Sequence, residues 1–236
     1  MINQHLYKTK AELYQNVAEF CAQKLTHSLQ QHNQASFIVP GGTTPAPVFD
    51  LLSKSDLDWS NITIAPSDER WLDSHHASSN EKLIRQTLLI HQASSAQFIG
   101  MKSEHKRAKD AQQQCSDRYE QIPTPYDVVM LGMGPDGHFA SLFSGSEPIQ
   151  QALDSHGEKS CIAINATGCK VAGEYTERMS MTLSAFLNSR HIILLFTGEE
   201  KLAIFEKAKQ INDSSQLPIC ALIHQNKVPV DLFWAP

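Results

Sequence analysis

The sequence predicts an α/β protein of three layers (α/β/α), in which helices cover both faces of a mainly parallel open sheet. Short apolar runs rich in β-branched residues alternate almost throughout with longer segments whose apolar residues recur at helical spacing. Several of these runs end directly in glycine-rich or polar turns, as buried parallel strands do. The chain shows no internal repeat, low-complexity tract or evident linker, so we expect one domain over residues 1–236.

The expected elements follow from apolar spacing and from residues typical of helix ends and turns. A first helix should begin after Thr9, which can cap it, because apolar residues from Leu13 to Leu29 fall on one face. Pro45 suits the first position of the next helix, with Thr44 as its N-cap. The other elements expected before the centre of the chain are strands at 36–39, 61–65 and 97–101, a loop at 66–71, and helices at about 79–90 and 103–121.

The second half of the chain continues the alternation. The run from Tyr126 to Leu131 is apolar and short enough to be a buried central strand. A helix should begin near Glu199, and the polar segment 144–160 should be a loop-like insertion in the same domain. Further strands are expected at 161–165, 191–196 and 217–223, and near Leu232.

Composition excludes several classes of function. Hydrophobic residues make up 41% of the chain and charged residues 19%, which argues against disorder. The formal net charge of −5 and the lack of a Lys/Arg run give no support to nucleic-acid or membrane binding. There is no signal-peptide pattern at the start, and no apolar stretch of membrane-spanning length. Scattered cysteines without C-x-x-C spacing favour buried free thiols in a reducing cytoplasm over zinc ligands: Cys21, Cys115, Cys161, Cys169 and Cys220.

The strongest functional signal is segment 131–138, Leu-Gly-Met-Gly-Pro-Asp-Gly-His. Its three glycines and one proline force the chain to turn sharply after the central strand. His138 then lies beyond the carboxyl end of that strand, where open α/β sheets bind ligands. A histidine there can titrate near neutral pH and act on a substrate, and Asp136 stands beside it. No histidine or carboxylate follows at i+3 or i+4, which disfavours a metal site, and Ser141 lacks the G-x-S-x-G context of a nucleophile.

Two further turns could bind an anion. Segment 41–45, Gly-Gly-Thr-Thr-Pro, joins a strand to a helix, where free N–H groups and threonine hydroxyls favour a phosphate. It matches no nucleotide-binding loop, and an ordinary capped turn is the alternative. In segment 68–70, Asp-Glu-Arg, Arg70 could face a phosphate or carboxylate, or the triplet could be a solvated charge cluster. Lys201 and Arg178 are equally open to a surface role.

Together and in this order, the motifs resemble those of the 6-phosphogluconolactonase family over nearly the whole chain. The segment G-M-G-P-D-G-H-x-A-S-L-F-x-G at 132–145 is the most specific of them. Two positions depart from the family pattern: Phe139 stands where threonine is usual, and Leu72-Asp73 replaces a Val-Pro pair. The remaining motifs are the G-G-T-T-P loop at 41–45, D-E-R at 68–70, R-x-S-x-T at 178–182 and G-x-x-K at 198–201.

The resemblance implies a cytoplasmic carboxylic ester hydrolase of the pentose phosphate pathway, with the fold shared by glucosamine-6-phosphate deaminases. Its reaction would be hydrolysis of 6-phospho-D-glucono-1,5-lactone to 6-phospho-D-gluconate, without a cofactor or metal. His138 would activate a water as general base, oriented by Asp136 or by Asp68, and the N–H groups of Gly134 and Gly137 are candidates to contact the oxyanion. The substrate phosphate would be held by Gly41, Gly42, Thr43, Thr44, Arg70, Arg178 and Lys201.

As partners we expect the sugar-phosphate lactone, with neither nucleic acid nor membrane, and a chain that is a monomer or a weak homodimer. Two other functions stay open. A related glucosamine-6-phosphate deaminase carries a glutamate five residues after the histidine, where this chain has Phe143. A non-catalytic sugar-phosphate-binding protein often carries a DNA-binding segment. Here the residues before the strand at 36–39 are read as one helix, without a helix-turn-helix or basic patch.

Overall fold

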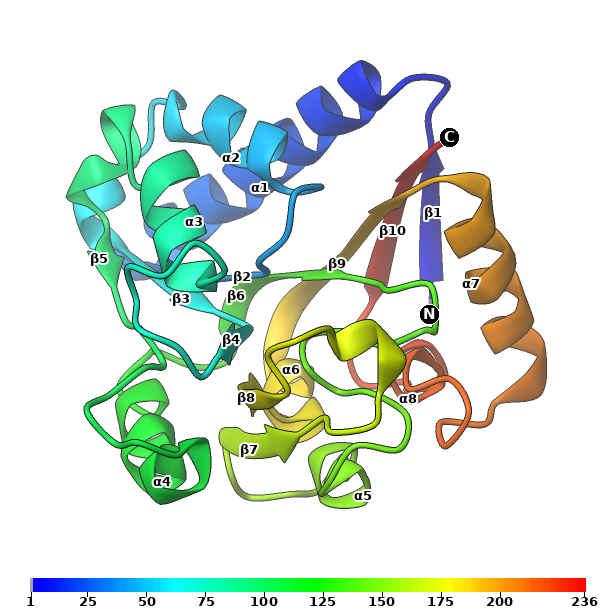
Figure 1. Cartoon of the computed structure of the whole chain (residues 1–236). Coiled ribbons are helices and arrows are strands. Elements are labelled where there is room, and N and C mark those ends of the chain that lie inside the picture. The colour runs from blue at the N-terminus through cyan, green and yellow to red at the C-terminus, as the bar shows by residue number, and fades with distance from the viewer. Residues whose placement is uncertain (1) are drawn as a thin grey trace.

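A computed structural model describes residues 2–236 and contains one seven-stranded sheet in which every neighbouring pair is parallel (Figure 1). The strand order is β1-β10-β9-β6-β2-β3-β5. From β2 the chain runs outward through β3 to β5 at one edge, and from β6 it runs outward in the opposite direction through β9 to β10, which lies next to the edge strand β1. The adjacent carboxyl ends of β2 and β6 therefore form a topological switch point, where such sheets bind ligands. The strands are β1 (Ile2–Leu6), β2 (Ala35–Val39), β3 (Ile62–Pro66), β5 (Gln97–Phe98), β6 (Tyr126–Gly132), β9 (Ser189–Thr197) and β10 (Val230–Ala235).

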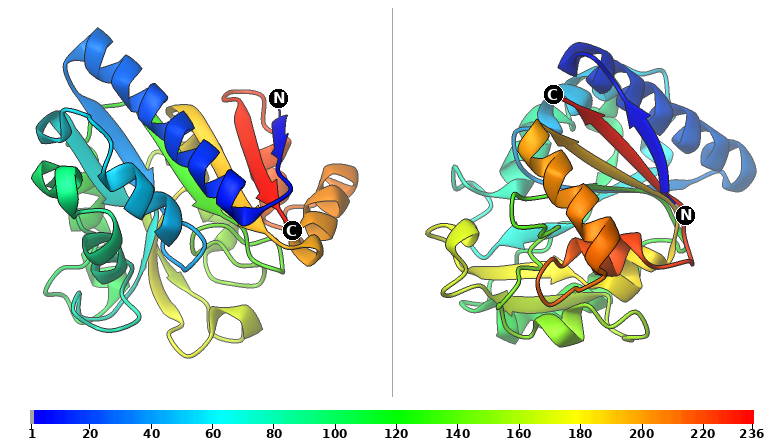
Figure 2. Two further views of the ribbon diagram at one scale, coloured as in Figure 1. Left: turned by 90° about the horizontal axis from the view of Figure 1, so that it is seen from above. Right: turned by 90° about the vertical axis from the view of Figure 1, so that its right-hand side faces the viewer.

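Helices cover both faces of this sheet, which confirms the predicted three-layer fold (Figure 2). Side chains alternate along each strand, so that Phe37 and Val39 join one core cluster and Ile38 joins the other. One face packs against α1 (Lys10–His32), α2 (Ala46–Ser53) and α3 (Asn80–Thr87). The other packs against α6 (Leu183–Leu187), α7 (Glu199–Ile211) and α8 (Ile219–Ile223), and the same core cluster includes α4 (Ala108–Tyr119), which packs mainly against the strands at 161–165 and 177–181.

A second, three-stranded antiparallel sheet has the order β4-β8-β7 and was not expected as a unit. It consists of β4 (Asp68–Arg70), β8 (Glu177–Met181) and β7 (Cys161–Asn165). The prediction that Asp68–Arg70 lies in a loop is wrong, because these residues pair with β8. The register sets Arg70 opposite Arg178, so this sheet brings two distant cationic residues together.

Other predictions need correction. Within residues 2–236 the first strand is β1, a mostly polar edge strand that pairs with β10, so the segment before β2 is not one helix. The segment 217–223 is not a strand, because α8 follows Pro218. A short apolar run does not by itself distinguish a strand from a helix. The polar segment 144–160 holds the short helix α5 (Ile149–Ala152), and α4 is shorter than the helix expected at 103–121.

Several local predictions are confirmed. Thr9 caps α1, its side chain accepting a hydrogen bond from the N–H of Glu12. One local prediction is wrong by one residue: the helix after the glycine turn begins at Ala46, so Pro45 occupies the N-cap position that was predicted for Thr44. All five cysteines are free thiols, and four of them are buried while Cys169 is partly exposed. The remaining 3₁₀ segments are Trp59–Asn61, His91–Ser95 and Lys170–Ala172.

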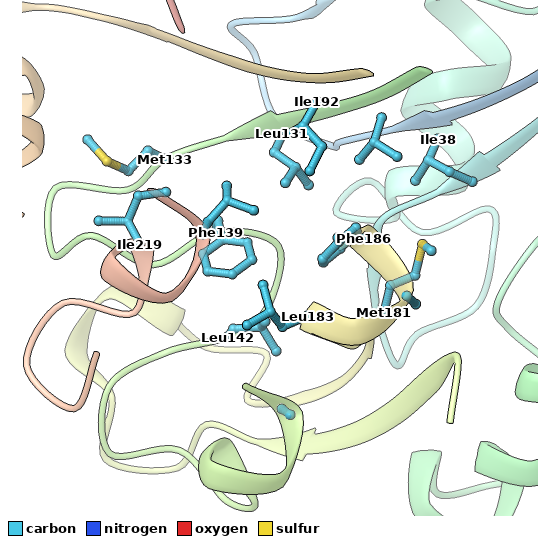
Figure 3. Packing of buried hydrophobic residues seen from close by; sticks show 14 of the residues in the cluster. Ile38, Leu131, Met133, Phe139, Leu142, Met181, Leu183, Phe186, Ile192 and Ile219 are labelled. Carbon is cyan, nitrogen blue, oxygen red and sulfur yellow. The ribbon is translucent and has the colours of Figure 1, made fainter. Parts of the chain in front are cut away.

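Phe139, one of the two departures from the family pattern, belongs to the hydrophobic core. Figure 3 shows it between Leu131 and Ile192 of the large sheet, Phe186 of α6 and Ile219 of α8. Its side chain is fully buried, with its ring centroid 6.0 Å from that of Phe186. Phenylalanine, which is larger than threonine, therefore fills core volume within the segment 132–145. Within the described range, no helix is both long and apolar enough to cross a membrane.

Candidate active site

A cavity of about 340 Å³ opens at the carboxyl ends of β2 and β6, beside the small sheet. The β2 turn (residues 40–45) forms one wall, and the β6 turn (residues 133–138) forms another. The small sheet adds Asp68, Arg70 and Arg178, and the start of α7 adds Lys201. All the candidate residues line this cavity except Asp136 and Gly137. Residues that are far apart in sequence thus meet at the switch point of the sheet.

The imidazole of His138 is held from one side by Asp136. The distance from Nδ1 of His138 to Oδ1 of Asp136 is 2.5 Å, and the backbone N–H of His138 donates to the same oxygen at 3.3 Å. The ring lies against Gly134, where a Cβ atom would come within 2.1 Å of Cε1. Within residues 2–236 no hydrogen bond engages Nε2 of His138, so this nitrogen is available to a ligand.

Asp136 is suited to remain a carboxylate. Burial opposes its ionisation, but the hydrogen bonds and the charge of His138 outweigh burial and hold the pKa of this carboxyl below its ordinary value. An ionised Asp136 accepts the Nδ1 proton and leaves Nε2 as the basic nitrogen of the ring. The geometry thus combines a base with a group that fixes its tautomer.

Asp68, the alternative partner of His138 in the sequence analysis, bonds elsewhere. Its Oδ2 accepts a hydrogen bond from Ser141 Oγ at 2.5 Å, and its Oδ1 lies 3.2 Å from Ser67 Oγ and 3.4 Å from Asn80 Nδ2. Asp136, and not Asp68, is therefore the carboxylate that contacts the imidazole. Asp68 is instead a buried charge on the arginine side of the cavity.

The β2 turn leaves its backbone donors unused. In the part of the chain that the structure describes, no acceptor bonds to the N–H groups of Gly41, Gly42, Thr43 or Thr44. Gly42 has φ of +90°, and a Cβ there would meet no atom within 4 Å. Gly41 needs to be glycine for another reason, because a Cβ would lie 1.9 Å from Oδ1 of Asn80. Free donors at the start of α2 suit an anion.

Two arginines add positive charge from the small sheet. Nη1 of Arg70 donates to the carbonyl of Ser78 at 2.6 Å, while its Nε is buried and has no acceptor in residues 2–236. Burial lowers the pKa of Arg178, the charge of Asp68 opposes this shift, and the nearby Arg70 adds to it. Two partly desolvated cations on one cavity wall favour an anionic ligand.

Lys201 completes the cationic wall. Burial lowers the pKa of Lys201, and the negative charge of Asp136 opposes part of that shift. The carboxylate that bonds to His138 therefore also acts on the charge of Lys201.

The prediction for the oxyanion needs correction. The N–H of Gly134 donates to the carbonyl of His138 at 2.9 Å, and the N–H of Gly137 donates to the carbonyl of Gly134 at 3.1 Å. Both donors are used to close the β6 turn on itself. In this arrangement they are not available to an oxyanion.

The sequence analysis assigned no binding or catalytic role to three residues that lie in or next to the site. The Phe143 ring is buried and lies near two site residues: its centroid is 4.3 Å from that of the His138 imidazole and 5.6 Å from Cζ of Arg178. Asn80 reaches the site through the N-terminus of α3, which the carboxylate of Glu69 holds. Burial raises the pKa of Glu69, and bonds from the N–H groups of Glu81 and Asn80 oppose that shift. Phe143 and the third residue, Ser141, belong to the central motif, whereas nothing in the sequence pointed to Asn80.

Comparison with known proteins gives consistent matches over the whole chain. A family described as glucosamine-6-phosphate isomerases/6-phosphogluconolactonase matches residues 8–234. The chain is 32% identical to a 6-phosphogluconolactonase of Rhizobium meliloti, covering 99% of each. The crystal structure of a 6-phosphogluconolactonase from Shewanella baltica superposes with a TM-score of 0.95 at 36% identity, covering 100% of this chain and 98% of that one. A monomeric glucosamine-6-phosphate deaminase superposes with a TM-score of 0.78 at 19% identity, covering 98% and 96%, which shows a common fold.

Proposed function

The chain belongs to the family of glucosamine-6-phosphate isomerases and 6-phosphogluconolactonases, and we propose that it hydrolyses 6-phospho-D-glucono-1,5-lactone to 6-phospho-D-gluconate. It is then a carboxylic ester hydrolase of the pentose phosphate pathway. Full-length similarity to proteins named 6-phosphogluconolactonase supports this reaction. At the site, one observation carries it: an imidazole fixed by a carboxylate lies in the same cavity as unused N–H donors and two arginines.

The proposed chemistry needs one base and one water. Nε2 of His138 takes a proton from the water while the water oxygen attacks C1 of the lactone. Asp136 stabilises the imidazolium that forms. The tetrahedral intermediate then collapses, the bond from C1 to the ring oxygen breaks, and the imidazolium returns its proton to that oxygen. A positioned base of this kind contributes about 10²–10⁴-fold to the rate. A lactone carbonyl is electrophilic enough that no covalent enzyme intermediate is required.

The other side of the cavity would bind the phosphate. The N–H groups of residues 41–44 and the hydroxyls of Thr43 and Thr44 supply donors, and Arg70 and Arg178 supply charge. Lys201 adds a third positive charge from α7. Holding the phosphate places the lactone carbonyl against His138, so binding energy at one end of the substrate assists chemistry at the other.

The site favours this reaction over the deaminase alternative. The position five residues after His138, where the deaminase carries a glutamate, is the buried Phe143 packed against the imidazole. A phenyl ring there supplies no carboxylate for ring opening. The purely binding alternative is disfavoured because the base and its orienting carboxylate are both present.

We further propose that the protein acts in the cytoplasm as a single domain over residues 1–236, as a monomer or a weak homodimer. Five free thiols suit a reducing compartment. The residues proposed for binding and for catalysis all come from one chain, and all of them line one cavity except Asp136, which contacts it through His138, so a second copy is not required to complete the site. The sugar-phosphate lactone is the only partner that the proposal requires.

The first experiment is acid release from freshly prepared 6-phosphogluconolactone, with spontaneous hydrolysis subtracted. We expect strong acceleration by the native protein and a loss of about 10²–10⁴-fold in kcat for His138→Ala, with KM little changed. The matched control is His75→Ala, because this histidine is exposed on a loop outside the cavity. Ammonia release from glucosamine 6-phosphate without lactone hydrolysis would overturn the proposal in favour of the deaminase.

A further inference from the structure

Ser141 is a buried hydroxyl that the proposed mechanism does not use. It lies three residues after His138 and directly follows Ala140, which has φ of +47°. Its side chain is fully buried, and it does not line the cavity. The hydroxyl instead lies behind two residues that do, Asp68 and Arg178.

The hydroxyl connects two charges of opposite sign. Ser141 Oγ donates to Oδ2 of Asp68 at 2.5 Å and accepts from Nη1 of Arg178 at 3.4 Å. Asp68 is 6% exposed and Arg178 is 5% exposed, so neither charge is compensated by bulk water. Across the described chain the two side chains make no direct ion pair, because the hydroxyl bridges them.

The other hydrogen bonds of Arg178 show which of its N–H groups stay free. Its Nε donates to the carbonyl of Tyr175 at 2.5 Å, and its Nη2 donates to the carbonyl of Ala172 at 2.6 Å. A guanidinium has five N–H donors. With Nη1 bonded to Ser141, three are used, and one N–H on each Nη atom is left for a ligand in the cavity.

We propose that Ser141 is a positioning residue for the phosphate side of the site. Its hydroxyl holds Arg178 in place and keeps Asp68 from pairing with it directly. A direct pair of Asp68 and Arg178 would neutralise the guanidinium and turn its donors away from the ligand. The inference rests on the proposed function in one respect, which is that the ligand of Arg178 is the phosphate of a sugar phosphate.

The test is a double-mutant cycle read by ligand binding. Dissociation constants for 6-phosphogluconate are measured by calorimetry for the native protein, Ser141→Ala, Arg178→Gln and the double variant. We expect Ser141→Ala to weaken binding about tenfold when Arg178 is present, in line with loss of a hydrogen bond to a charged group. In the Arg178→Gln background the same change should cost less than about twofold, because Ser141 acts through the arginine.

Ser116→Ala is the matched control. Ser116 is also a buried serine, bonded to the backbone of Cys161 and outside the cavity, so this variant loses a buried hydroxyl without touching the site. We expect its affinity for 6-phosphogluconate to equal that of the native protein. In steady-state kinetics Ser141→Ala should raise KM for the lactone about as much as it raises the dissociation constant, while kcat changes little.

Equal losses from Ser141→Ala in both backgrounds would overturn the inference, because a general structural role acts independently of Arg178. So would unchanged binding by Ser141→Ala. If Ser141→Ala does not fold, the same cycle is run with Ser141→Cys, whose thiol is somewhat larger than the hydroxyl and is a weaker donor. If the native protein does not hydrolyse the lactone, the proposed function fails, but the cycle still tests Ser141 with inorganic phosphate as the probe.

Discussion

The two turns that flank the cavity leave neighbouring strands at the same edge of the sheet, yet they use their backbones in opposite ways. In the β2 turn, the N–H groups of residues 41–44 bond to no acceptor in the described chain. In the β6 turn, the N–H groups of Gly134, Gly137 and His138 all bond inside the turn. The β2 turn therefore leaves its N–H groups free to bind a ligand, whereas the β6 turn uses its N–H groups in internal hydrogen bonds that fix the position of His138.

The difference shows that glycine serves two purposes at this site. Gly42 has positive φ and open space around it, so it shapes a backbone that a ligand can approach. Gly134 has no such space, because the ring of His138 occupies the volume that a Cβ would take. The same substitution in each turn should therefore damage a different kinetic constant.

Gly134→Ala should produce the largest effect. The new Cβ would overlap the imidazole, which lies 2.1 Å away at Cε1, so the ring of His138 must shift. A displacement of about 1 Å of a catalytic group costs about a hundredfold in rate. We expect kcat for lactone hydrolysis to fall about that much, with KM nearly unchanged. A rise in KM without a fall in kcat would remove the distinction between the two turns.

Arg70→Ala should act on the opposite constant. Each charge-assisted hydrogen bond to a phosphate contributes about 1.5–3 kcal/mol, and we expect KM for the phosphorylated lactone to rise about tenfold to a hundredfold. The control is Arg107→Ala, because Arg107 is exposed and its ion pair with Asp110 lies outside the cavity. An unchanged KM in Arg70→Ala would exclude this arginine from phosphate binding.

Gly42→Ala should have a smaller effect of the same kind. A Cβ fits the space at this position, but alanine at positive φ costs about 1–2 kcal/mol, and relaxation of the turn would displace the N–H donors. We expect KM to rise about tenfold and kcat to stay within about twofold. Gly168→Ala is the control, since Gly168 has φ of +88°, equally open space and no place in the cavity wall. Equal KM increases in both variants would show that backbone strain alone explains the result.

How far the sequence predicted these features depends on the range of the interactions that determine them. The β6 turn was predicted well, because its glycines, its histidine and the strand before it are contiguous. The long parallel strands were predicted for the same reason, since their apolar runs are local signals. The strand β4 was missed because three residues carry no periodicity, and the pairing of Arg70 with Arg178 depends on a partner strand over a hundred residues away.

The sequence also could not predict which of two polar groups forms a given hydrogen bond. Asp136 and Asp68 were equal candidates to orient His138, and only the folded arrangement shows that Ser141 bonds to Asp68. The oxyanion prediction failed at Gly134 and Gly137 for a related reason. Glycines indicate that a turn exists, but not whether its N–H groups are used within it.

The smallest expected effect is on stability, and it tests whether the β6 turn also stabilises the folded state. Because His138 holds the pKa of Asp136 below its unfolded value, the carboxylate stabilises the folded state above an unfolded pKa of about 3.9. That contribution is lost as the pH falls through the folded pKa.

Asp136→Asn lacks this carboxylate. Above about pH 5 we therefore expect its free energy of unfolding to be lower than that of the native protein by on the order of 1 kcal/mol. The difference should shrink in denaturant titrations as the pH is lowered below about 4. Asp56→Asn, at an exposed carboxylate away from the cavity, should show no such trend. If the deficit of Asp136→Asn were the same at acid pH, the bond to His138 would serve the geometry of the base and not the stability of the turn.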